Sequence, residues 1–287
     1  MTDMHSEKTE AYTLFKPKEA LPLVMDSPHS SPIFPTDFHA ALPLEDLRDG
    51  EDVFIDELWS HAPDHGAHLL LAEFARTYID PNRHVGDVDL AMIEGDWPHT
   101  YEPSGKAHIG KSLIWRTLDD GRPIYKRKLS VDEVHQRIQR YALPYQAKLQ
   151  NLIHAHHQQF GVCYHINCHS MNAVSGKMGE GGAGIPRADV VLGDRDGSTC
   201  SAELTQLVKE FMQQCGYDVK VNDPFKGVEL VRAFSNPAQG KHSLQIELNK
   251  RLYTDASGRG KGPGYQKLNQ DLIALTALLA DFSKSKI

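Results

Sequence analysis

The sequence predicts an α/β fold, because short apolar runs alternate with segments of helical periodicity. The runs are four to seven residues long, as buried strands are, and we expect strands at 21–25, 68–74, 162–168, 189–192 and 243–248. No internal repeat and no Pro/Ser-rich linker divides the 287 residues. We therefore expect a single domain over residues 1–287, with 1–20 as an N-terminal extension.

Helical patterns lie between and after these strands. Residues 46–60, 199–215 and 265–282 repeat apolar side chains at helical spacing. Ser130 and Glu133 form a capping box, in which each side chain accepts a hydrogen bond from the other residue's free backbone N–H, so a helix is predicted to begin there. Pro144 should kink or break that helix, and a second helical segment follows it.

Composition and charge exclude several functional classes. Hydrophobic residues make up 40% and charged residues 24%, and the net charge of -7 argues against nucleic acid as the main partner. The N-terminus has no signal-peptide pattern and no apolar run reaches membrane length, so we expect a cytoplasmic protein without a membrane partner. The four cysteines show no C-x-x-C spacing, and we interpret them as small core residues.

Two of the apolar runs end in the dipeptide His-Ser. His29 follows the first run, between Pro28 and Pro32, and His169 ends the run that begins at Val162. Ligands collect where the carboxyl ends of strands give way to loops, so these two histidines could meet there. Neutral imidazole is a common zinc ligand, and a catalytic zinc needs three protein ligands and one open position.

A carboxylate could supply the third ligand. The segment GEDVFIDELW offers Asp52 and Asp56, which would share one face of a helix at i and i+4. We favour Asp56, because it lies deeper within the apolar pattern, with Asp52 as the alternative. Alternatively, both are solvated helix acids.

Glu247 is a candidate general base. It alternates with Leu244, Ile246 and Leu248 in a predicted strand, where a lone buried carboxylate is costly. Beside a metal, such a group can act as a base with a tuned pKa. The alternative is an edge strand whose polar face lies in water.

Arginines could bind an anionic substrate. Arg76 and Arg83 follow the second strand, with Asp80 between them to orient either one, and Arg232 follows a later apolar run. A guanidinium binds a carboxylate bidentately, although surface salt bridges would give the same pattern. The glycine-rich loop at 176–184 is interpreted as a flexible rim or lid, or as a plain surface loop.

The motifs together resemble the N-formylglutamate amidohydrolase (deformylase) family, over about residues 22–253. The resemblance rests on six segments in order, which are SPHS (27–30), DVFIDELW (52–59), RTYIDPNR (76–83), CHSM (168–171), GDRDGSTC (193–200) and QIEL (245–248). It implies a three-layer α/β/α sandwich around a mixed sheet, related to the zinc carboxypeptidases.

The resemblance also implies the roles of individual residues. His29, His169 and Asp56 would bind one zinc ion per chain, or another divalent metal. Glu247 would be the catalytic base. The substrate's carboxylates would be bound by three arginines, Arg83 and, less directly matched, Arg76 and Arg232.

The implied reaction is hydrolysis of N-formyl-L-glutamate to formate and L-glutamate, in histidine degradation. The alternatives are a zinc amidohydrolase acting on another N-acyl amino acid and a metal- or ligand-binding protein without catalysis. In each case the partner is a small molecule, and the sequence does not determine the oligomeric state.

Overall fold

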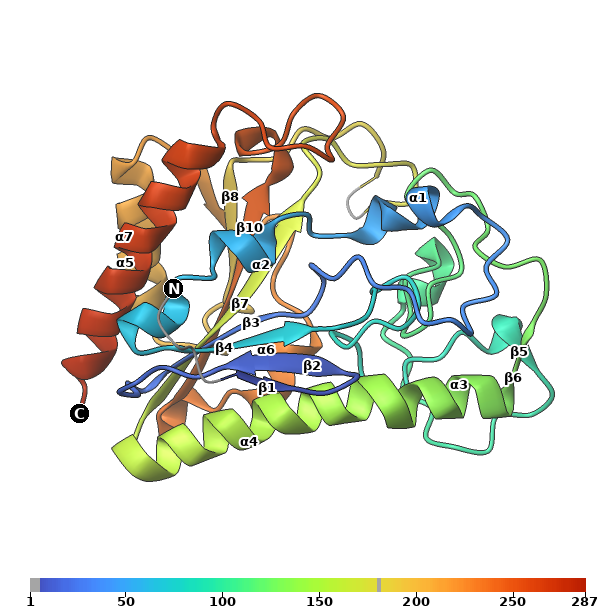
Figure 1. The fold of residues 1–287 in the computed structure, drawn as a ribbon, viewed down its shortest axis with the longest axis horizontal. Helices are drawn as coiled ribbons and strands as arrows, with labels where there is room; N and C mark the ends of the chain where they lie inside the picture. Colours follow the sequence, from blue (N-terminus) through green and yellow to red (C-terminus); the bar gives the residue numbers. More distant parts are fainter. Residues whose placement is uncertain (1–5, 180–181) are drawn as a thin grey trace.

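An eight-stranded mixed sheet forms the centre of the molecule (Figure 1). The computed structural model describes residues 6–179 and 182–287. In spatial order the strands are β1 (Ser6–Lys8), β2 (Tyr12–Phe15), β4 (His68–Ala72), β3 (Leu23–Ser27), β7 (Cys163–Met171), β10 (Lys241–Asn249), β8 (Val190–Gly193) and β9 (Val219–Val221). The four central strands β4, β3, β7 and β10 are parallel, whereas β2 and β8 join them antiparallel.

All five predicted strands are present, with boundaries shifted by at most three residues. The structure adds strands that were not predicted. The stretch expected as an N-terminal extension contributes β1 and β2, which form one edge of the sheet. A separate parallel pair consists of β5 (Ile93–Glu94) and β6 (Leu129–Ser130).

Helices cover both faces of the sheet. On one face, α4 (Leu143–Phe160) and α6 (Glu229–Phe234) contact β3, β7 and β10. On the other, α5 (Ala202–Gln214) and α7 (Tyr265–Lys284) contact β8, β9 and β3, and in Figure 1 they stand at the left while α4 runs along the bottom. The mixed sheet between helices confirms the predicted α/β class.

The helix predicted from the capping box is confirmed. The Ser130 hydroxyl accepts from the Glu133 N–H, and the Glu133 carboxylate accepts from the Ser130 N–H, at the start of α3 (Val131–Arg137). A π-helical turn, Ile138–Ala142, joins α3 to α4. Pro144 lies in the first turn of α4, where its missing N–H costs little, so the helix continues instead of breaking.

The single helix predicted for residues 46–60 is wrong. The chain there forms α1 (Leu44–Leu47), a 3₁₀ turn (Arg48–Gly50) and the one-turn helix α2 (Ile55–Leu58). Phe54 adopts a left-handed conformation with φ 62°, which interrupts any continuous helix. Residues 51–54 are consequently non-helical.

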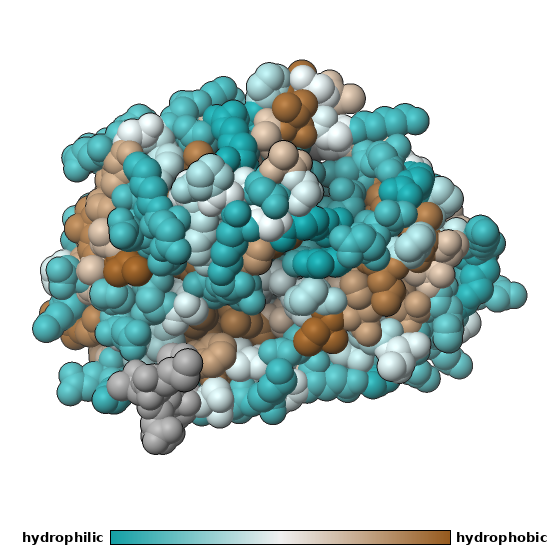
Figure 2. Space-filling model, turned by 45° about the horizontal axis from the view of Figure 1, so that its top comes forward, coloured by the Kyte–Doolittle hydropathy of each residue, from teal (hydrophilic) through white to brown (hydrophobic). Residues whose placement is uncertain are grey.

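The face seen in Figure 2 is largely hydrophilic. That view brings the top of Figure 1 forward, and teal side chains cover most of it, with only small brown patches between them. In the described ranges, no helix is long and apolar enough to cross a membrane.

Candidate active site

Strand alternation places a row of polar side chains on one face of the sheet. Asn167 and His169 share this face of β7, and the register pairs them with Gln245 and Glu247 of the parallel strand β10. His29 lies two residues beyond the end of β3, the strand on the other side of β7. The two histidines therefore meet at the carboxyl ends of adjacent strands, as predicted, and Glu247 lies in register with His169 on the next strand.

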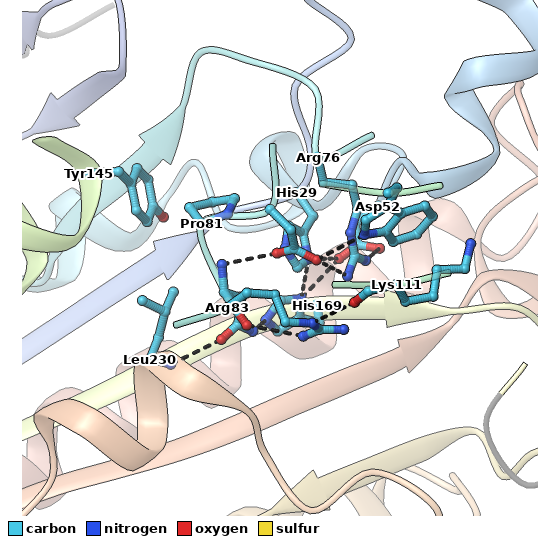
Figure 3. Close-up of polar contacts among 12 residues, drawn as sticks. His29, Asp52, Arg76, Pro81, Arg83, Lys111, Tyr145, His169 and Leu230 are labelled. Atoms are coloured by element: carbon cyan, nitrogen blue, oxygen red, sulfur yellow. Dashed lines mark hydrogen bonds and ion pairs between the residues drawn. The ribbon is translucent and has the colours of Figure 1, made fainter. Parts of the chain in front are cut away.

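His29, Asp52 and His169 form a buried group that we call the His–Asp–His cluster (Figure 3). The Nδ1 atoms of the two imidazoles are 3.1 Å apart. Asp52 Oδ2 is 3.0 Å from Nδ1 of His169 and 3.6 Å from Nδ1 of His29. Ligand atoms in a tetrahedral zinc site are about 3.3–3.4 Å apart, so these spacings suit a zinc ion.

The outer nitrogens of both histidines already have acceptors. Nε2 of His29 is 2.7 Å from Asp80 Oδ1, and Nε2 of His169 is 2.7 Å from Asn167 Oδ1. With the ring protons donated there, both Nδ1 lone pairs face Asp52, and burial lowers the pKa of His169, which favours its neutral form. Three electron-donor atoms that converge in this way, one each from His29, Asp52 and His169, could bind a metal cation.

Asp52, not Asp56, is the carboxylate that lies beside the histidines. The preference for Asp56 assumed a continuous helix, but the chain is non-helical at Asp52, whose backbone N–H donates to the His29 carbonyl at 2.9 Å. Burial opposes ionisation of Asp52, yet its close contacts with the imidazoles of His169 and His29 and the positive charge of Arg76 hold its pKa below the usual range. Asp56 is partly buried on α2 and does not belong to the His–Asp–His cluster.

Glu247 is a buried carboxyl group with an elevated pKa. Burial, reinforced by the charge of Asp52, raises the pKa of Glu247 to about 8, against the opposing effect of Arg76. Its Oε1 accepts a hydrogen bond from Gln245 Nε2 at 2.8 Å. A carboxyl group poised near neutral pH can accept and return a proton.

Asp80 connects Arg76 to the cluster. Asp80 accepts from Nη2 of Arg76 at 3.1 Å and from Nε1 of Trp115 at 3.2 Å, in addition to its contact with His29. Nη1 of Arg76 lies 3.9 Å from Asp52, while the buried Nε of Arg76 has no hydrogen-bond partner among the described residues. This places a cationic group beside the cluster.

A cavity of about 140 Å³ opens onto the cluster, and Arg76, Arg83 and Glu247 line it. Arg83 donates from Nε to the Lys111 carbonyl and from Nη1 to the Asn82 carbonyl, which fixes its guanidinium. Arg232 does not line this cavity. Its side chain is half-exposed and bidentately paired with Glu229, three residues earlier on α6.

Sequence reasoning missed several residues that shape the site. Asn82 Nδ2 lies 3.1 Å from His169 Nε2, and Asn167 bonds the same nitrogen. Lys111 and Lys250 line the cavity as well. Only Asn167 carried a usable signal, since it alternates with His169 in a predicted strand. From the glycine-rich loop, Met178 and Gly179 line the cavity, whereas residues 180–181 lie outside the described ranges.

Three buried electron donors that could hold a metal ion lie beside a buried carboxyl group, and this combination suits a hydrolase that acts on amide bonds. The sequence model of the N-formylglutamate amidohydrolase family matches residues 21–254, and the chain belongs to this family. It is 27% identical to N-formylglutamate deformylase from Pseudomonas putida over 249 residues, which are 82% of each chain. The deformylase from Pseudomonas aeruginosa is 26% identical over 242 residues, 82% of this chain and 83% of the relative.

Solved structures agree with this assignment. The crystal structure of N-formylglutamate amidohydrolase from Ralstonia eutropha JMP134 superimposes with a TM-score of 0.91 at 43% identity, covering 97% of this chain and all of that one. A gene product from Agrobacterium tumefaciens shares the fold, with a TM-score of 0.67 at 15% identity over 97% of this chain and 95% of its own.

Proposed function

We propose that this enzyme hydrolyses N-formyl-L-glutamate to formate and L-glutamate, with a divalent metal, zinc by preference, held by His29, Asp52 and His169. The observation that carries the proposal is the convergence of three electron-donor atoms beside a carboxyl group of raised pKa. The substrate follows from the names of the relatives in both Pseudomonas species and in Ralstonia. A place in histidine degradation and a relationship with the zinc carboxypeptidases stay predictions.

The bound metal would polarise the formyl oxygen and lower the pKa of the attacking water towards about 7. Glu247 then accepts a proton from the attacking water, while the oxygen of that water forms a bond to the formyl carbon. Arg76, 3.9 Å from Asp52, supplies positive charge near the oxyanion that develops. Glu247 returns the proton to the leaving nitrogen as the C–N bond breaks, so that formate and the free amino acid result.

The cavity favours a small dicarboxylic substrate. Its volume of about 140 Å³ is below the ~300–1,000 Å³ of sites for drug-sized ligands. The fixed guanidinium of Arg83 in its wall suits a carboxylate. Turnover of N-formyl-, N-acetyl- and N-succinyl-L-glutamate, compared side by side, would separate the proposed reaction from deacylation of another N-acyl amino acid.

The test is formate release from N-formyl-L-glutamate, measured with and without a chelator and with added zinc. We expect activity that the chelator abolishes and zinc restores. Glu247→Gln should keep the metal and lower kcat by about 10²–10⁴-fold, because the base is lost. A Glu247→Gln enzyme with a near wild-type rate would show that Glu247 is not the base. Stoichiometric metal without hydrolysis of any acyl-glutamate would favour a binding protein.

A further inference from the structure

Lys250 is a cation in the cavity wall whose ammonium group has no partner among the described residues. It lies directly after β10, three residues beyond Glu247, and lines the same cavity as the His–Asp–His cluster. No hydrogen bond or ion pair joins its ammonium group to any residue in the part of the chain that the structure describes. Lys250 is partly buried, and this burial lowers the pKa of its ammonium group.

The acidic side chains around Lys250 are bonded to other groups. Asp52 belongs to the His–Asp–His cluster, and Asp119 Oδ1 is 3.0 Å from the ammonium of Lys111. Asp49 Oδ2 accepts from the Asp119 backbone N–H at 2.9 Å. These acids lower the cost of a buried ammonium from a distance, but none of them is within ion-pair distance of it.

The backbone of Lys250 is firmly held. Its carbonyl accepts from the N–H groups of Tyr253 and Thr254, at 3.2 and 2.9 Å, and from the Thr254 hydroxyl at 2.8 Å. The preceding Asn249 side chain donates to the Ala188 carbonyl at 2.9 Å. The base of the side chain is thus fixed, which reduces the entropy lost when the ammonium binds an anion.

Two of the other cations that line the cavity are paired with carboxylates of the protein. Arg76 pairs with Asp80 and Lys111 with Asp119, whereas Arg83 retains Nη2 after binding two carbonyls. We propose that Lys250 binds one of the two carboxylates of the substrate, with Arg83 available for the other. This inference rests on the proposed function, since it assumes a dicarboxylic substrate.

The test compares Lys250→Met with the wild-type enzyme on three substrates. These are N-formyl-L-glutamate, N-formyl-L-glutamine, which lacks the side-chain carboxylate, and N-formyl-L-isoglutamine, which lacks the α-carboxylate. We expect kcat/KM for N-formyl-L-glutamate to fall about 10- to 100-fold, mainly through KM, because a charge-assisted hydrogen bond is lost. Of the two amide substrates, the one that lacks the carboxylate bound by Lys250 should have the same kcat/KM with Lys250→Met as with the wild type. That substrate therefore identifies which carboxylate Lys250 binds.

Two control variants separate binding from folding. Lys250→Arg keeps the charge and should recover part of the lost kcat/KM. Lys220→Met removes a half-exposed lysine of β9 that pairs with Asp223 and lies outside the cavity, and it should leave all three substrates unaffected. An equal loss on all three substrates in Lys250→Met, or no loss on any, would overturn the inference.

A binding measurement keeps this inference separate from the proposed reaction. Glutarate carries two carboxylates and no amide bond, so its affinity for the metal-loaded enzyme can be measured by calorimetry without turnover. Lys250→Met should weaken glutarate binding about 10- to 100-fold. Unchanged affinity, or no glutarate binding by the wild type, would overturn the role of Lys250. Failure of the wild type to release formate would instead overturn the proposed function.

Discussion

The two faces of the central strands differ sharply, although alternate residues of the same strands build both. One face of β7 and β10 is apolar and packs with α5 and α7 in a single core cluster, through Ile166, Cys168, Leu244, Ile246 and Leu248. The opposite face is polar and equally buried, with His165, Asn167, His169, Ser243, Gln245 and Glu247. The side chains that form the apolar core and those that form the candidate site therefore lie on opposite faces of one sheet.

The polar face tolerates burial because its groups are connected. Asp26 of β3 accepts from Asn167 Nδ2 at 2.7 Å, from His165 Nε2 at 2.9 Å and from the Tyr145 hydroxyl at 2.7 Å. Asn167 in turn accepts from His169. A buried carboxylate with three donors avoids the desolvation cost that an isolated one would incur, and the chain of bonds extends to the His–Asp–His cluster.

The largest effect is expected from removing the carboxylate of the cluster on the polar face. Asp52→Asn should abolish both metal retention and activity, because an amide is a poor replacement for an anionic ligand. Asp56→Asn is the matched control on the adjacent α2 and should keep both. Metal content by mass spectrometry and formate release would check this. Loss of metal in Asp56→Asn with retention in Asp52→Asn would return the ligand role to Asp56.

On the apolar face, Leu244→Ala should reduce stability and leave the chemistry intact. Leu244 is fully buried, and truncating such a side chain costs about 2–5 kcal/mol of unfolding free energy. Denaturant unfolding would measure the loss, and kcat of the folded fraction should stay close to that of the wild type. A lowered kcat at full folding would show that the two faces are not separable.

Within the polar face, Asp26→Asn should weaken metal binding through Asn167. The amide keeps one acceptor oxygen and turns the other into a donor, so three donors compete for a single acceptor and Asn167 is held less firmly towards His169. Residues that hold a ligand in this way contribute about 10- to 100-fold in metal affinity. Tyr145→Phe is the control, since it removes one bond to Asp26 and leaves Asn167 in place. Competition with a chromogenic chelator would measure both, and equal affinities in the two variants would contradict the role of Asp26.

The last prediction concerns stability alone, as a pH dependence in the metal-free protein. Glu247 has a pKa of about 8 in the folded state, above its usual 4.5, so the folded state binds the extra proton between these values. Stability should therefore fall as pH rises from about 4.5 to about 8, by up to about 1.4 kcal/mol per pH unit. Glu247→Gln should flatten this slope in chelator-treated samples. An unchanged slope would assign the dependence to other groups.

Local patterns in the sequence were enough to single out several of the residues that lie together at the candidate site, and their roles stay predictions. His29, His169 and Glu247 were found because they lie in or directly after strands, where alternation and strand ends are visible in the sequence. Asp52 was ranked below Asp56 because the left-handed Phe54, which breaks the expected helix, leaves no clear signal in the sequence. The contact between His29 and Asp80 joins residues 51 positions apart, and such pairings depend on the fold.

The arginines also show that local sequence patterns do not reveal which partners a side chain has in the folded protein. Arg76 and Arg83 follow β4 in the sequence and line the cavity, whereas their binding of substrate stays a prediction. Arg232 has the same residue type, but its neighbour Glu229 binds it on α6. Lys250 was not singled out, because the absence of a partner is a property of the folded surroundings.

The backbone bond between Asp52 and His29 has a further consequence. It fastens the loop after β3 to the non-helical stretch before α2 through main-chain atoms alone. This bond does not involve either side chain, so an exchange at position 29 or 52 leaves that main-chain link between the two loops available.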